Sequence, residues 1–386
     1  MGGSASDEQV QAARARYAPA PSAHPTSSVR REDFEPPPEV GGSRVRRRVL
    51  ILGAVVIVAV AAITLVPGLA SLRTRFAHGD AWWLALGAAL KLLSGFSYVA
   101  VFRGVFCPRM RWRTSAEIGL AELGANAVIP VGGAGGLALG AWALQRGGMD
   151  GAKIARRSVA FFLLTSLPNV LGVIIIGLGL AVGAFPGHAG LALTLLPALI
   201  AAAAIVVTIT GGRLAAAAEQ RLAARRGRSS RAAKILRALS DGVVEALSLL
   251  REGNPWLLIG LVGYLVFDVM VLWATFHAFG SAPTLAIVWI GYLIGELGGL
   301  IPLPGGLGGV ELGLVGMLVL YHVPVGAATA AVLGYRAIAL VVPAAVGVVA
   351  FAMLRRSVAR ETLAISCCEP GGEVEVIGRG TVRITV

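Results

Sequence analysis

Seven charged side chains lie within long apolar stretches of this chain, where a charge is costly. A charge at the centre of a bilayer costs about 2.5–3.5 kcal/mol even on insertion scales, so a residue that keeps one there is a candidate for function. The seven are Lys91, Arg103, Glu122, Asp268, Glu296, Glu311 and Arg336. Lys91 and Arg103 have stems that can carry the charge to an interface, the interpretation we favour for Arg103. Arg336 needs an anion, and Glu296, Glu311, Asp268, or the phosphate of a substrate can supply it.

Two glycine-rich breaks interrupt the apolar stretches, and their sequences are alike. Residues 122–136 read ELGANAVIPVGGAGG, and residues 296–309 read ELGGLIPLPGGLGG. Each begins Glu-Leu-Gly, reaches Ile-Pro and ends in two Gly-Gly pairs. Discontinuous helices at corresponding places are typical of transporters built from repeats, because free backbone groups and helix ends then lie at membrane depth. The breaks therefore predict a substrate site.

The breaks and the last apolar stretch supply the predicted site. The predicted substrate-binding residues are Glu122, Asn126, Glu296, Gly305, Gly306, Glu311 and Arg336. A half-helix that begins near Gly306 would direct its positive end at a phosphate. Glu122 and Asn126 are four residues apart and share a helix face, where they could bind a polar headgroup or a proton. Close helix packing is the alternative for the glycines, but it leaves Glu296 and Glu311 unexplained.

The composition indicates an integral membrane protein. The chain is 56% hydrophobic and 14% charged, which leaves too little polar surface to cover a soluble particle of 386 residues. Several uncharged runs exceed the roughly 18 residues that cross a bilayer. We predict spans at about 49–70, 82–106, 158–184, 189–210, 254–279 and 326–354.

The charges in the connections predict how the two interrupted segments, 116–144 and 285–321, enter the membrane. Arginine and lysine concentrate in 107–115, 145–157 and 211–253, which predicts that these regions are cytoplasmic. The connections 185–188, 280–284 and 322–325 contain neither residue, which predicts that they are external. Each interrupted segment thus has both flanks on one side and must enter the membrane and return. A re-entrant helical hairpin fits this pattern, and arms that cross fully also fit.

The order span, hairpin, span occurs twice with opposite orientation. Repeat one covers 82–184 and repeat two covers 254–354. We therefore predict an all-α polytopic membrane protein with two inverted repeats, six full spans and two re-entrant hairpins.

The remaining segments flank or connect this transmembrane domain, predicted at 44–356. Residues 1–43 are rich in Ala, Pro and Ser and predict a disordered cytoplasmic tail, and 357–386 form a short C-terminal tail, also cytoplasmic. The basic region 211–253 predicts an amphipathic helix, on the spacing of Leu236, Leu239, Val243, Leu247 and Leu250. This helix would lie either in the headgroup layer or on the cytoplasmic ends of the bundle.

Several classes of function are not expected. The glycine clusters lack the Lys-Ser/Thr of a phosphate-binding loop, and no Ser/His/Asp arrangement is apparent, so we predict no enzyme. The three cysteines form neither a disulfide framework nor a metal-ligand spacing, and we expect no metal and no cofactor. The net charge of +13 lies at membrane edges, so nucleic acid is not an expected partner.

The second break resembles a known family. Residues 301–311 read IPLPGGLGGVE, and the last span contains Tyr335-Arg336 and PAAVG at 343–347. Together they resemble the flippase-like membrane region of the lysylphosphatidylglycerol synthase family, over about residues 49–354. The resemblance implies a plasma-membrane protein that moves or handles a polar lipid between leaflets. By position, the family's Pro-Gly-Gly-Leu-Gly and Glu fall on 304–308 and Glu311, and its last-span arginine on Arg336.

Two departures limit that resemblance. The family usually has Pro-Gly-Arg followed by Gly-Glu at the first break, whereas 130–136 carry no charge here, so the resemblance does not extend headgroup recognition to that side. The family's soluble aminoacyl transferase domain has no counterpart in this sequence. Aminoacylation of a lipid is therefore not expected.

We predict a lipid flippase or transporter that moves an anionic or polyprenyl-type lipid between the leaflets of the plasma (inner) membrane. Its expected partner is the phosphate-bearing headgroup of that lipid. Two alternatives stay open: a non-catalytic scaffold that binds a cell-envelope or glycosyltransferase partner through 211–253, and a lipid-headgroup-modifying enzyme.

Overall fold

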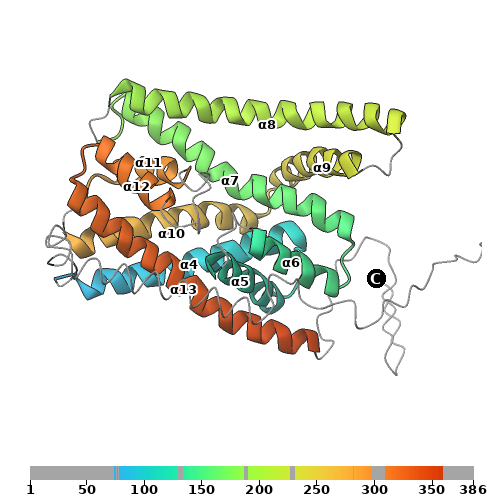
Figure 1. Ribbon diagram of the computed structural model, residues 1–386, viewed down its shortest axis with the longest axis horizontal. Coiled ribbons are helices and arrows are strands. Elements are labelled where there is room, and N and C mark those ends of the chain that lie inside the picture. Colours follow the sequence, from blue (N-terminus) through green and yellow to red (C-terminus); the bar gives the residue numbers. More distant parts are fainter. Residues whose placement is uncertain are drawn as a thin grey trace, which may run out of the picture. The chain divides into compact units, whose positions relative to one another are not determined.

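All regular structure in the described part of the chain is helical, and all of it is α-helix except for a 3₁₀ turn at Glu296 and Leu297. The computed structural model describes Thr74, Phe76 and residues 78–128, 134–186, 190–226, 231–280, 282–297 and 309–359. The helices discussed below are α4 (Ala81–Phe106), α5 (Trp112–Val128), α6 (Ala134–Arg146), α7 (Gly151–Ala181), α8 (Leu191–Arg226), α9 (Arg231–Glu252), α10 (Pro255–Phe279), α11 (Leu285–Gly295), α12 (Gly309–Leu320) and α13 (Val325–Ala359) (Figure 1). They lie in one compact unit within Pro36–Val386. The predicted all-α class is confirmed for these residues.

Five of the described helices are long and apolar enough to cross a membrane. They cover Ala81–Phe106, Gly151–Ala181, Leu191–Gly211, Pro255–Phe279 and Val325–Val358. These helices correspond to five of the six predicted spans, and the chain is a multi-pass membrane protein. The predicted first span at 49–70, the predicted tail 1–43 and the residues after 359 lie outside the described part.

Polar caps determine where three of these helices begin. The side chains of Asp80, Asp150 and Asn254 each accept a hydrogen bond from the backbone N–H two residues further on, at 2.8, 2.9 and 3.1 Å. These bonds satisfy donors that the first turn of a helix leaves unpaired. The cap at Asp150 explains why α7 begins at Gly151, earlier than the predicted residue 158.

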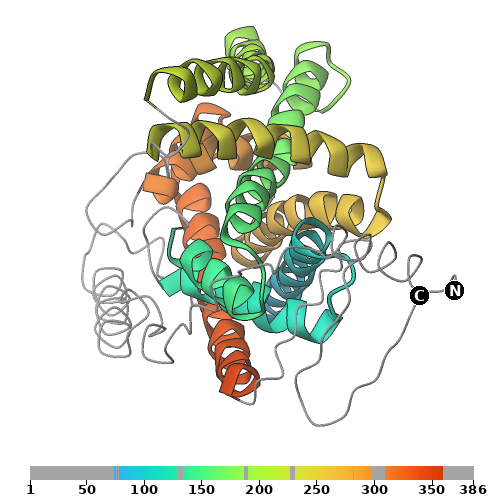
Figure 2. The same ribbon diagram turned by 90° about the vertical axis from the view of Figure 1, so that its right-hand side faces the viewer.

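Each interrupted segment contains two short helices that contact each other. α5 and α6 form the first helix pair, and α11 and α12 form the second helix pair. The residues between the members, 129–133 and 298–308, lie outside the described part. In Figure 1 the two pairs lie toward opposite ends of α10, and in Figure 2, which looks along that direction, the first pair is nearer the viewer.

The eight helices α4–α7 and α10–α13 repeat in order and in spacing. Their starts form four couples, Ala81 with Pro255, Trp112 with Leu285, Ala134 with Gly309 and Gly151 with Val325, at a nearly constant offset of about 174 residues. The contacts repeat as well. The contact between α4 and α5 corresponds to that between α10 and α11, and the contact between α5 and α13 corresponds to that between α11 and α7. Likewise, the contact between α4 and α7 corresponds to that between α10 and α13, and the contact between α6 and α7 corresponds to that between α12 and α13. We call α4–α7 the first half and α10–α13 the second half.

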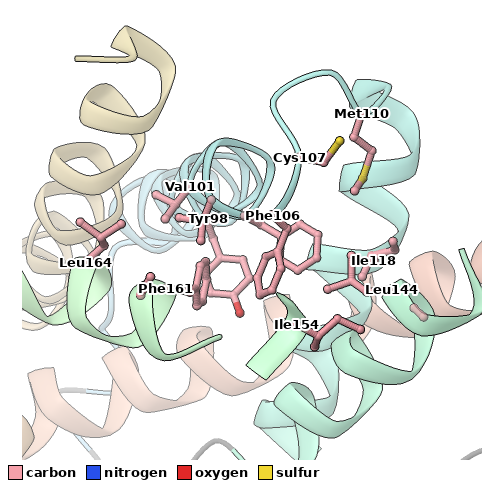
Figure 3. Close-up of a cluster of buried hydrophobic side chains, with 14 of the residues drawn as sticks. Tyr98, Val101, Phe106, Cys107, Met110, Ile118, Leu144, Ile154, Phe161 and Leu164 are labelled. Carbon is pink, nitrogen blue, oxygen red and sulfur yellow. The ribbon is translucent and has the colours of Figure 1, made fainter. Parts of the chain in front are cut away.

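Two apolar clusters and several close helix crossings hold these halves together. Figure 3 shows part of the cluster around Phe161 and Tyr98, whose rings meet edge to face at 5.3 Å. A second cluster surrounds Leu272 on α10. At the crossing of α5 with α13, a Cβ added to Gly124 would lie 2.5 Å from the Cα of Gly347. Without a hydrophobic force between helices in lipid, such close contact is what stabilises a bundle.

Helices α8 and α9 pack on α7 and on each other, outside the repeated halves. α8 continues through residue 211, where the predicted loop begins, as far as Arg226. The predicted amphipathic helix is α9, and it packs on the bundle, which is one of its two predicted placements. It approaches α7 through Gly242, where a Cβ would lie 2.6 Å from the Cβ of Val159. Leu239 and Leu247, expected on its apolar face, are therefore left exposed.

Candidate functional site

An ion pair joins the two central helices near the middle of their length. Lys91 Nζ on α4 lies 2.7 Å from Asp268 Oδ1 on α10, and only 11% and 8% of the two side chains are exposed. The helices approach closely because small residues face the contact: a Cβ at Gly260 would lie 2.8 Å from the carbonyl oxygen of Ser97. Lys91 thus keeps its charge inside the protein and does not extend to an interface.

Two tyrosines extend this ion pair toward α11 and α13. The Tyr292 hydroxyl donates to Asp268 Oδ2 at 3.5 Å, and the Tyr335 hydroxyl donates to the Tyr292 hydroxyl at 3.3 Å. Sequence analysis missed both residues. A signal was present, because Tyr292 precedes Glu296 by one helical turn and Tyr335 directly precedes Arg336.

A second ion pair joins α12 to α13. Arg336 Nε donates a hydrogen bond to Glu311 Oε1 at 2.7 Å, and the two side chains are 18% and 20% exposed. Glu311 lies in the first turn of α12, where the helix dipole favours a carboxylate. Sequence analysis left the anion for Arg336 open among three carboxylates and a substrate phosphate. In the structure, Glu311 makes that contact.

Glu296 adds a third carboxylate to these two ion pairs. It follows the last residue of α11 as its C-cap. Its Oε1 atom is buried and has no hydrogen-bond partner in the described part of the chain. Glu296 interacts electrostatically with the four charged residues of the ion pairs, Arg336, Asp268, Lys91 and Glu311. We call these five residues the charged cluster.

An apolar groove begins at the charged cluster. Its walls come from α4 and α5 of the first half and from α10 and α13 of the second half. Apart from Lys91, Ser94 and Tyr264, the lining residues are apolar or glycine. Leu92 and Phe96, which also line it, are 41% and 60% exposed, so the groove is open at the side of the bundle. The groove thus offers an apolar path that starts at a charged residue.

The first helix pair uses its polar side chains for its own packing. Asn126 Oδ1 on α5 accepts a hydrogen bond from the backbone N–H of Gly136 on α6 at 2.8 Å. A Cβ at Gly140, one turn further along α6, would lie 2.7 Å from Glu122 Oε2. Glu122 and Asn126 therefore share a face, and that face contacts α6. Their role in substrate binding stays a prediction.

The other predicted residues lie apart from the charged cluster or outside the described part of the chain. Arg103 stands at the end of α4, where its Nε donates to the carbonyl oxygen of Met110 at 2.7 Å. Its guanidinium lies over the ring of Trp112, 4.7 Å from the centroid. Gly305 and Gly306 precede α12 and fall outside the described residues.

A comparison with protein families identifies the chain at this point. The family model described as "Lysylphosphatidylglycerol synthase TM region" matches residues 50–347. The chain belongs to this family. The match to the lysylphosphatidylglycerol synthase TM region includes all five residues of the charged cluster and both helix pairs, and it supports a membrane lipid-related function. A search of curated proteins found no match to the chain.

Proposed function

We propose that this protein translocates an anionic or polyprenyl-type lipid between the two leaflets of a membrane. The observation that carries this proposal is the meeting of the charged cluster with the apolar groove at Lys91. A lipid presents a polar headgroup and an apolar tail, so a protein that moves it needs both surfaces side by side. The family's link to membrane lipids supports the same function.

The cations of the charged cluster are suited to a phosphate. A guanidinium recognises phosphate through two parallel hydrogen bonds, and an ammonium acts as a point charge. Arg336 and Lys91 each lie 2.7 Å from a carboxylate, so the bundle holds both cations in place in the absence of a substrate. A bound phosphate would replace one of these carboxylates, and the tail would occupy the groove beside Leu92 and Phe96.

We further propose that the two halves are inverted repeats and that each helix pair is a re-entrant hairpin. The constant spacing and the matching contacts of α4–α7 and α10–α13 support a duplication. Transporters of this kind expose a central site alternately to the two sides by moving one half against the other. The charged cluster includes residues from both halves, since Lys91 belongs to α4 and the other four residues follow residue 254.

The orientation is part of the same proposal. We place the protein in the plasma membrane with both termini in the cytoplasm, because arginine concentrates in 107–115, 145–157 and 211–253. In the structure, Arg157 on α7 donates to Glu245 on α9 at 3.0 Å, and Arg156 lies 3.3 Å from the same carboxylate. These ion pairs hold α9 at the end of α7 where the basic residues gather.

Leaflet exchange in proteoliposomes tests the function. Wild-type protein should accelerate the movement of fluorescent phosphatidylglycerol or a labelled polyprenyl phosphate, read by quenching of the outer leaflet. Arg336→Gln should slow it at least about tenfold, which corresponds to about 1.4 kcal/mol. Arg251→Gln is the matched control, because Arg251 is exposed on α9, outside both halves, and the exchange rate should not change.

Three results would contradict the proposal. Equal rates for wild type and Arg336→Gln would remove the charged cluster from lipid movement. Chemical conversion of the lipid by the purified protein would favour the enzyme alternative. A normal exchange rate in a variant that lacks α9, together with loss of its cellular function, would favour the scaffold alternative.

A further inference from the structure

The charged cluster contains one carboxylate more than its cations can pair. Asp268, Glu296 and Glu311 face two cations, and each cation already lies 2.7 Å from one carboxylate, Lys91 from Asp268 and Arg336 from Glu311. Glu296 is the carboxylate left over. If all five groups were ionised, the cluster would carry one surplus negative charge.

That surplus charge would lie on a buried carboxylate. Glu296 Oε1 is buried and unpartnered among the described residues. An ionised carboxylate removed from water is strongly disfavoured unless it is paired and hydrogen-bonded, and the usual response is that the group takes up a proton. A substrate phosphate would not relieve this condition, because it adds negative charge.

We propose that Glu296 is a proton-binding site and that its protonation is coupled to lipid translocation. The coupling rests on the proposed function, whereas the proton site does not. When protonated, Glu296 is neutral and Arg336 stays with Glu311, as in the structure. When the O–H bond breaks and the proton leaves to water, the new carboxylate competes with Glu311 for Arg336 and so pulls on α13 and on the second helix pair.

The surroundings of Glu296 are compatible with this exchange. The ionisable and charged side chains that face it are Lys91 on α4, Tyr264 and Asp268 on α10, Tyr292 on α11, Glu311 on α12, and Tyr335 and Arg336 on α13. α7 also packs on α11, and its residues 158–181 contain no charged side chain. Lys91 and Arg336 are the two cations that face Glu296, and Arg336 is the one on α13, where it pairs with Glu311.

A proton fits this site better than a metal cation. Alkali and alkaline-earth ions need several oxygen ligands around one point. Within the described residues, no group of three or more His, Cys, Asp or Glu side chains is placed to hold a metal ion. A single unpartnered carboxylate oxygen is sufficient for a proton.

Infrared difference spectroscopy of the detergent-solubilised full chain, titrated with pH, tests the proton site without transport. Wild type should show the C=O stretch of a carboxylic acid that disappears as the pH rises, and Glu296→Gln should lack that band. Glu122 is also a buried carboxylate, so the band of Glu296 is the component that is lost in Glu296→Gln and kept in Glu122→Gln. Glu296→Asp should shift the band without removing it. Persistence of the band in Glu296→Gln, or a wild type without such a band, would overturn the proposal.

Proteoliposomes with an imposed pH gradient test the coupling. The gradient should change the wild-type exchange rate at least about threefold in the favourable direction, while Glu296→Gln should give one rate in both conditions. A wild-type rate that ignores the pH gradient, or follows a sodium gradient instead, would overturn the coupling and leave lipid movement intact. No exchange under any gradient would reject the proposed function, and the infrared result would still decide the proton site.

Discussion

The two helix pairs occupy equivalent places in the two halves but differ in chemistry. In the first pair, α5 meets α6 through Asn126 and the backbone of Gly136, and Glu122 lies against Gly140. In the second pair, Glu296 and Glu311 are drawn into a cluster with cations from α4 and α13. Both pairs are closely packed, since a Cβ at Gly295 on α11 would lie 2.7 Å from the Cα of Leu314 on α12. The difference is that the polar side chains of the first pair face its own helices, whereas the carboxylates of the second pair face cations on other helices.

Corresponding positions show how this difference arose. At the common offset of about 174 residues, Asp268 corresponds to Ser94, Lys91 to Leu265 and Arg336 to Phe162. Glu296 alone keeps a carboxylate, at Glu122. A backbone arrangement can therefore be repeated while the ionisable residues differ between the halves. Lys91 is the charge that the first half supplies to the cluster, and the second half supplies the other four.

The largest expected effect comes from removing the anion of the central ion pair, compared with a substitution at the corresponding position of the first half. Asp268→Asn leaves the buried ammonium of Lys91 without its anion, and this should lower the free energy of unfolding by about 3–5 kcal/mol. Ser94→Ala at the corresponding position should change it by less than about 1 kcal/mol, because Ser94 Oγ is buried and has no partner among the described residues. Denaturation with SDS in mixed micelles measures both. Equal effects would remove the proposed asymmetry.

A second test concerns the contact between the halves at α5 and α13. Gly124→Ala places a methyl group against backbone, 2.5 Å from the Cα of Gly347, and should destabilise the fold by about 1–3 kcal/mol. Gly316→Ala is the matched control, since nothing lies within 4 Å of a Cβ at that position. The same SDS titration reads both variants. A tolerated Gly124→Ala would show that this crossing is looser than described.

A double-mutant cycle sharpens the description of the second ion pair. Arg336→Gln, Glu311→Gln and the double variant should give a coupling free energy of about 1–2 kcal/mol, reduced from that of a fully buried pair because both side chains are partly exposed. Their unfolding free energies under identical conditions supply the cycle. Additive effects would mean that the two residues do not stabilise one another.

The smallest expected effect is in the first helix pair. Asn126→Ala removes the hydrogen bond to Gly136 and should cost about 0.5–1.5 kcal/mol, without a change in lipid exchange beyond that of the stability loss. The proteoliposome assay at matched protein amounts separates the two quantities. A loss of exchange with normal stability would assign the first pair a substrate-binding role, as sequence analysis predicted.

The sequence was sufficient to predict the helices, but not to predict which charged residues pair with each other. Long apolar stretches predicted the five described spans, and the Gly-Pro breaks predicted where the short helices separate. Lys91 and Asp268 are 177 residues apart, and no local pattern states that α4 and α10 pack along their length. For Arg336, the sequence did not distinguish among three carboxylates, because the spacing of residues along the chain does not give the distance between residues on different helices. The tyrosines were missed since an aromatic residue in an apolar helix has packing as its ordinary role.

The central claim is that a lipid headgroup binds at the charged cluster while its tail lies in the groove. An experimental density map of the protein in lipid nanodiscs, with the substrate lipid added, tests it most directly. The account predicts headgroup density beside Arg336 and Lys91, with tail density running past Leu92 and Phe96. Headgroup density confined to the first helix pair or to the surface of α9, with the cluster and groove lacking lipid, would contradict it.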